Sequence, residues 1–94
     1  MSIAYFNGAF LPPEQIRISP DERGFLFADG VYEVARKYGN YFFAMADHQI
    51  RLQRSLDGLR IDWKGVDSVP GIAEELIDRN QLEDKDAIFY IQVT

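Results

Sequence analysis

The spacing of apolar residues changes near residue 46, and this change constrains the fold most. Before it, apolar and polar residues alternate in short runs, whereas after it apolar residues recur at helical intervals. A period of two is typical of strands and a period of 3.6 of helices. Residues 87–94 then give a strong strand signal. The order of elements predicts an α+β fold, an antiparallel β-sheet with two helices packed against it.

Two β-hairpins are expected in the first half of the chain. Asn7-Gly8 separates two short apolar runs, and both residues tolerate the positive φ that a two-residue hairpin turn needs. Gly39-Asn40 joins residues 31–38 to residues 41–43 in the same way. Between the hairpins, residues 19–22 combine a capping serine, a proline and two acids, which predicts one short helical turn.

The alternation within residues 31–38 assigns their side chains to two faces. One face carries Tyr32, Val34, Arg36 and Tyr38, and the other carries Val31, Glu33, Ala35 and Lys37. Neither face is purely apolar. We therefore expect both faces to be covered, or one of them to line a cavity.

The second half of the chain predicts two amphipathic helices. The first begins near Asp47 and carries its apolar stripe at Leu52, Leu56 and Leu59. The second has Pro70 in its first turn, where a missing N–H costs nothing. Its apolar stripe consists of Val69, Ile72, Ala73, Leu76 and Ile77. Asn80 is expected to end this helix in the left-handed conformation.

Composition excludes several classes of partner. Fifteen acids against ten bases give a net charge of -5, so nucleic acid and anionic membranes are repelled. No cysteine is present and His48 is the only histidine, which leaves no ligand set for zinc or iron. Neither a signal peptide nor an apolar run of about 20 residues is found. We expect a cytoplasmic protein of one domain, without metal, nucleic acid or membrane.

Two motifs carry a resemblance to a known family. Asp21 and the stretch from Arg23 to Val34 resemble the signature of fold-type IV pyridoxal-phosphate-dependent enzymes, in the form shown by D-amino acid aminotransferases. His48, followed by Arg51 and Leu52, is similar to a helix start of this branched-chain and D-amino acid aminotransferase superfamily. Asp29-Gly30 differs from the branched-chain pattern, and Ala28 departs from a common glycine. The resemblance covers essentially all 94 residues.

The resemblance implies roles for three residues in a pyridoxal 5'-phosphate enzyme. Arg51 would bind the cofactor phosphate, because a guanidinium donates two parallel hydrogen bonds to such a group. Tyr32 and Val34 would lie on the substrate side. From the residues alone, a solvated helix arginine and a core tyrosine remain alternatives for Arg51 and Tyr32.

Other conspicuous polar residues are given structural roles or none. Glu33 faces away from Tyr32, so we expect it to pair with a neighbouring arginine or with backbone amides. A single histidine at a helix start, such as His48, is more often structural than catalytic. Arg36 shares the face of Tyr32 and is assigned no role beyond solvation.

The implied enzyme is a homodimeric aminotransferase that moves an amino group from a D-amino acid, such as D-alanine, to a 2-oxo acid. Residues 1–94 would form the small N-terminal domain of a two-domain enzyme, apparently truncated. Lys37, Lys64 and Lys85 do not match the lysine that holds the cofactor, so no catalytic residue is assigned and the chain alone is expected to be inactive. An aminodeoxychorismate lyase of the same superfamily and a non-catalytic stand-alone domain are the alternatives.

Overall fold

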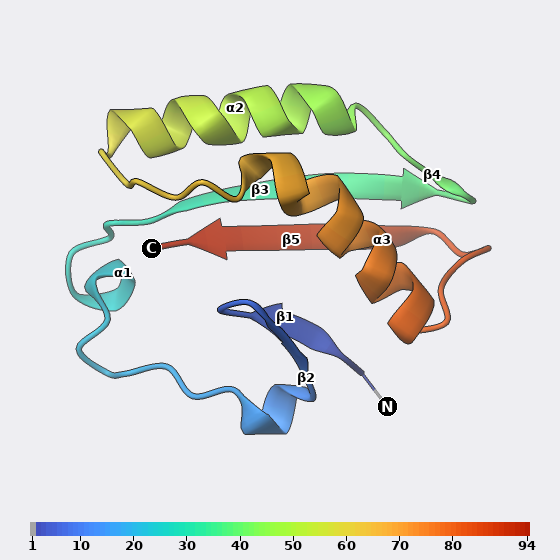
Figure 1. The fold of residues 1–94 in the computed structure, drawn as a ribbon, viewed down its shortest axis with the longest axis horizontal. Helices are drawn as coiled ribbons and strands as arrows, with labels where there is room; N and C mark the ends of the chain where they lie inside the picture. Colours follow the sequence, from blue (N-terminus) through green and yellow to red (C-terminus); the bar gives the residue numbers. More distant parts are fainter. Residues whose placement is uncertain (1) are drawn as a thin grey trace.

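The computed structural model describes residues 2–94, with the side chain of Phe25 left out. The strands form two separate antiparallel sheets, accompanied by two longer helices and one short helix (Figure 1). The predicted α+β class is therefore confirmed, although one sheet was expected. The chain leaves the first sheet at Pro12-Pro13, which cannot donate ladder hydrogen bonds, and this separates the first hairpin from the later strands.

The first hairpin forms as predicted. Strand β1 (Ala4–Phe6) pairs antiparallel with β2 (Ala9–Leu11), with Tyr5 opposite Phe10. Asn7 and Gly8 both have positive φ, 49° and 90°, as the two-residue turn requires. A short 3-10 turn, Pro13–Gln15, follows.

The predicted helical turn lies further along the chain than expected. Residues 19–22 form a turn in which Ser19 Oγ accepts a hydrogen bond of 3.1 Å from the backbone N–H of Asp21. Helix α1 (Arg23–Leu26) begins only after this turn. Serine side chains offer the backbone a local alternative to the helix, which displaces the helix start.

The second hairpin and the last strand form a three-stranded sheet. Its strands are β3 (Val31–Tyr38), β4 (Tyr41–Phe42) and β5 (Ala87–Val93), in the order β4-β3-β5. Val34 lies opposite Tyr90 in the β3–β5 register. Because β4 has two residues and β3 has eight, most of one edge of β3 has no strand partner within residues 2–94.

Helix α2 (Met45–Gly58) runs beside β3 and closes the core (Figure 1). Leu52 and Leu56 are buried as predicted. The expectation for Leu59 is wrong: it is 46% exposed, because the helix ends at Gly58 and Leu59 only caps it. The buried cluster consists of Val31, Leu52, Leu56, Val66 and Val69. In the described part of the chain, no helix is both long and apolar enough to cross a membrane.

Helix α3 (Val69–Arg79) connects the core to the first hairpin. Asn80 is not left-handed as expected, since its φ is -98°; Gln81 takes the positive φ of 59° instead. The Asn80 side chain accepts from the N–H of Ile3 at 2.8 Å and donates to the carbonyl of Ile3 at 2.9 Å. The side chain of Asn80 thus replaces a strand partner for the start of the chain.

Lys37 joins the β3–β4 turn to the loop between α3 and β5. Its side chain is buried, and the three N–H groups of Nζ are shared among the carbonyls of Leu82, Glu83 and Lys85, at 2.7–2.9 Å, and that of Gly39. A buried ammonium is tolerated only where such acceptors replace water. This contact holds two distant loops at one end of the sheet.

Candidate functional site

Strand β3 presents two different faces, as its alternation predicts. Val31, Glu33, Ala35 and Lys37 are buried beneath α2 and its neighbours, whereas the four residues between them are exposed. We call these the inner face and the outer face of β3. Tyr32 is 64% exposed and Val34 is 37% exposed. Within residues 2–94 the outer face is uncovered, so the first of the two expected alternatives, that both faces are covered, is not met, and the second, that one face lines a cavity, stays a prediction.

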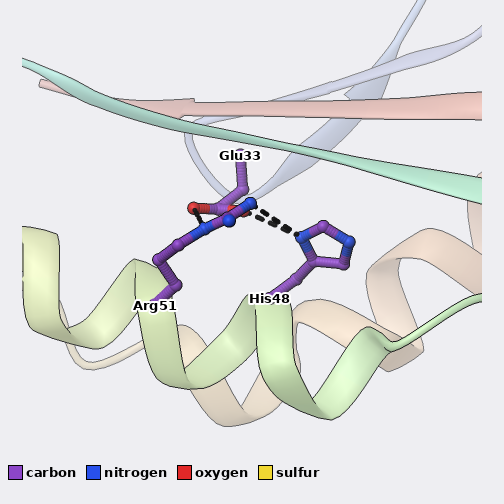
Figure 2. Close-up of polar contacts among 3 residues, drawn as sticks. All are labelled: Glu33, His48 and Arg51. Atoms are coloured by element: carbon purple, nitrogen blue, oxygen red, sulfur yellow. Dashed lines mark hydrogen bonds and ion pairs between the residues drawn. The ribbon is translucent and has the colours of Figure 1, made fainter.

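A buried carboxylate organises the inner face beside α2. Glu33 Oε2 accepts a hydrogen bond from Arg51 Nε at 2.8 Å, and Oε1 accepts one from Arg51 Nη2 at 2.7 Å (Figure 2). Oε1 also lies 2.8 Å from His48 Nδ1. An ionised carboxylate only accepts, so Nδ1 carries the hydrogen in this contact. The expectation that Glu33 pairs with an arginine is confirmed.

These partners determine the ionisation of Glu33. The hydrogen bond from Arg51 lowers the pKa of Glu33 below its usual value; burial opposes this shift, and the hydrogen bond from His48 adds to it. In return, Glu33 raises the pKa of Arg51. The pair is a fixed carboxylate and guanidinium, with no tendency to exchange a proton near neutral pH.

Arg51 keeps one edge of its guanidinium available. Nε and Nη2 form the edge that Glu33 holds, and no hydrogen bond in the described residues engages Nη1. Nη2 lies 3.4 Å from His48 Nδ1, but that nitrogen already donates to Glu33 and cannot also accept. The Arg51 side chain is 62% exposed. One edge is therefore fixed by the protein while the opposite edge faces outward.

The other two predicted residues lie across the sheet from Glu33. Tyr32 stacks on Tyr90 of β5 with ring centroids 6.0 Å apart, and Tyr90 donates a hydrogen bond of 2.8 Å to Gln92. Val34 pairs with Tyr90 in the register. The structure thus brings Tyr32 and Val34 together and places Arg51 on the other side of β3. The unpaired edge of β3 separates the two groups.

Tyr90 and Gln92 were missed from the sequence. Both were recognised as strand residues, but their approach to Tyr32 depends on the β3–β5 register. The sequence does show that Tyr90 and Gln92 lie on the same face of β5, because they are two positions apart in a strand. It does not tell which residues of β3 they oppose, because β3 and β5 are separated by nearly fifty residues.

A hollow elsewhere on the described surface is lined mainly by acidic and other polar residues. Its volume is about 260 Å³, and it lies between the end of α2 and the segment 61–67. Asp57, Asp62 and Asp67 line it, with Lys64 as the only cation, and Lys64 already pairs with Asp62 at 2.8 Å. This negative surface does not suit a phosphate. Residues 2–94 contain no group of three potential ligands placed to hold a metal ion.

The side chains of Arg51 and of the three lysines differ in how well they suit a phosphorylated cofactor. The outward edge of Arg51 offers N–H groups in the geometry that phosphate oxygens accept. The lysines offer no equivalent fit for a covalent bond to an aldehyde. Lys37 is buried among carbonyls, Lys64 is paired with an acid, and Lys85 lies in the loop before β5. The residues present fit the phosphate of pyridoxal phosphate and not its aldehyde.

Comparisons with known proteins agree with the motifs. The chain is 33% identical over 95 aligned residues to the D-alanine aminotransferase of Staphylococcus aureus strain MSSA476, covering all of this chain and 33% of that protein. It is 34% identical over 90 residues to the D-alanine aminotransferase of Bacillus licheniformis, covering 95% of this chain and 31% of that protein. No family model matches.

Over essentially its full length the chain is similar to D-alanine aminotransferases, which confirms the resemblance predicted from the motifs. It spans about a third of the length of these relatives. Their names support an aminotransferase.

Proposed function

We propose that residues 1–94 form the N-terminal domain of a cytoplasmic, homodimeric, pyridoxal-phosphate-dependent aminotransferase. The complete enzyme would transfer the amino group of a D-amino acid, such as D-alanine, to a 2-oxo acid. The full-length similarity to D-alanine aminotransferases supports this assignment. The remaining two thirds of such an enzyme would supply the lysine that this chain lacks.

The observation that carries the proposal is the two-edged arrangement of Arg51. Buried Glu33 holds one edge of the guanidinium with hydrogen bonds of 2.8 and 2.7 Å, so the side chain cannot turn freely. Its outward edge is then oriented before a ligand arrives. Such preorganisation reduces the entropy lost on binding, which favours a phosphate anchor over a merely solvated arginine.

The residues on the two faces of β3 would have different roles, cofactor binding on one face and substrate binding on the other. Arg51 binds the phosphate, and Glu33 orients Arg51. Tyr32 presents its phenol, and Val34 an apolar surface, toward the amino acid substrate. The bound cofactor supplies an electron sink for the bond changes at the substrate α-carbon. None of these residues transfers the α-proton, so the chain alone is inactive.

The reaction class is tested on the complete protein. 2-oxo acid formation from D-alanine is measured beside pyruvate release from aminodeoxychorismate. We expect the first reaction and not the second. Pyruvate release without transamination would replace the proposal by the lyase. Failure of both reactions, with no cofactor bound, would replace it by a non-catalytic domain.

A further inference from the structure

The side chain of His48 lies beside Arg51 near the start of α2. The two residues are three positions apart, so both project from the same side of the helix toward β3 (Figure 2). Their exposure differs: 62% of the Arg51 side chain is exposed and only 20% of the His48 side chain. The same carboxylate, that of Glu33, is therefore approached by one exposed and one sheltered partner.

The carboxylate of Glu33 is fixed by hydrogen bonds to both of its oxygens. Oε1 accepts from Arg51 Nη2 at 2.7 Å and from His48 Nδ1 at 2.8 Å, whereas Oε2 accepts from Arg51 Nε at 2.8 Å. Because only 7% of the Glu33 side chain is exposed, water cannot readily replace a donor that is lost. Among these donors, His48 supplies the only one that does not belong to Arg51.

His48 is placed to support Arg51 and not to bind a ligand itself. Nδ1 is engaged by Glu33, and Figure 2 shows the other ring nitrogen, Nε2, directed away from Arg51. The hollow that His48 lines together with Met45 and Leu52 has a volume of about 10 Å³, which is at the lower limit for one water molecule. Neither Nδ1 nor this hollow is available to a ligand.

We propose that His48 is a positioning residue for the phosphate anchor, which holds Glu33 so that Glu33 in turn fixes the direction of Arg51. This inference rests on the proposed function, in which the outward edge of Arg51 binds the phosphate of pyridoxal phosphate.

The physical reason is the freedom of a glutamate carboxylate to rotate about its last side-chain bond, a torsion with broad minima. If the carboxylate of Glu33 turned, Arg51 would lose one of its two hydrogen bonds and its outward edge would move. A donor from a second side chain limits this rotation. A guanidinium held in one direction loses less entropy when it binds a phosphate.

The test measures the dissociation constant of pyridoxal phosphate by its absorbance in the complete protein. His48→Leu removes the donor, His48→Asn keeps an N–H at the position of Nδ1, and His48→Gln moves it to the position of Nε2. Gln49→Leu is the matched control, because Gln49 is also partly buried on α2 and donates one side-chain hydrogen bond, to the carbonyl of Val66 at 3.1 Å. Thermal unfolding of each variant is recorded in parallel.

We expect His48→Leu and His48→Gln to raise the dissociation constant by about 3- to 10-fold, the value of one hydrogen bond. His48→Asn should retain most of the wild-type affinity, and Gln49→Leu all of it. Equal dissociation constants for His48→Asn and His48→Gln would overturn the inference, and this comparison decides alone if His48→Leu does not fold. An effect of His48→Leu that Gln49→Leu reproduces, with the same change in unfolding temperature, would also overturn it.

A double-mutant cycle tests whether His48 acts through Arg51. In the Arg51→Ala background, His48→Leu should change the dissociation constant by less than about twofold, because no guanidinium remains to be positioned. An undiminished effect in that background would overturn the inference, since His48 would then act on the cofactor without Arg51. A wild-type complete protein that binds no pyridoxal phosphate would instead refute the proposed function.

Discussion

The two faces of β3 both carry charged and apolar residues, yet one face is buried and the other is exposed. On the inner face, Glu33 and Lys37 are buried, and other elements supply their partners. On the outer face, Arg36 has no partner within residues 2–94, and Tyr32 is 64% exposed. The difference lies in what packs against each face. Charges on the inner face hold the fold, whereas Arg36 on the outer face is exposed within residues 2–94.

Arg51 connects these two roles. It belongs to the inner face through Glu33, but its side chain is 62% exposed and its second edge points outward. A residue that is held at one end and open at the other suits binding better than stability. The comparison therefore predicts that inner-face variants change stability and outer-face variants change function.

The largest effect on stability is expected for Lys37→Met. Removing Nζ leaves the carbonyls of Gly39, Leu82, Glu83 and Lys85 without their common donor. We expect a loss of about 3 kcal/mol in the free energy of unfolding, measured by urea denaturation of the 94-residue chain. The outer-face control, Arg36→Met, should change it by less than about 0.5 kcal/mol. Equal losses would remove the distinction between the faces.

A smaller, pH-dependent effect is expected for Glu33→Gln. Because the folded-state pKa of Glu33 lies below its ordinary value of 4.5, its stabilisation is complete above that pH and is lost as the pH falls through the lowered pKa. We expect a loss of about 1 kcal/mol at pH 7, reduced by the exposure of Arg51. The difference between wild type and variant should shrink below pH 4.5. A difference independent of pH would show that the carboxylate charge is not involved.

The smallest effect on stability is expected for Tyr32→Phe. The ring can keep its stacking on Tyr90, and its hydroxyl makes no hydrogen bond to residues 2–94. Unfolding should change by less than about 0.5 kcal/mol. In the complete enzyme, kcat/KM for D-alanine should fall about tenfold if the phenol contacts the substrate. A stable variant with unchanged kcat/KM would remove Tyr32 from the substrate site.

Local chemistry explains what could be predicted from the sequence. The Asn7-Gly8 turn, the alternation of β3 and the apolar stripe of α2 all depend on neighbours along the chain. The pairing of Glu33 with an arginine was also predictable, because a carboxylate on a covered face needs a partner. These features follow from short-range patterns.

The rest depends on contacts between distant segments. The carbonyls around Lys37 come from residues more than forty positions away, and the partner of Asn80 is Ile3. The sequence alone therefore indicated an ordinary lysine beside a turn for Lys37 and a helix cap for Asn80. The separation of Tyr32 from Glu33 followed from parity, but the stacking of Tyr32 on Tyr90 required the β3–β5 register.

The most direct test of the account concerns the outward edge of Arg51. The dissociation constant of pyridoxal phosphate is measured by its absorbance in the complete protein for the wild type, Arg51→Ala and Arg54→Ala. Both substitutions remove an exposed arginine from α2, but only Arg51 is held by Glu33. We predict that Arg51→Ala weakens cofactor binding by about 10- to 100-fold and that Arg54→Ala leaves it unchanged. Equal binding by the two variants would contradict the assignment of Arg51 as the phosphate anchor.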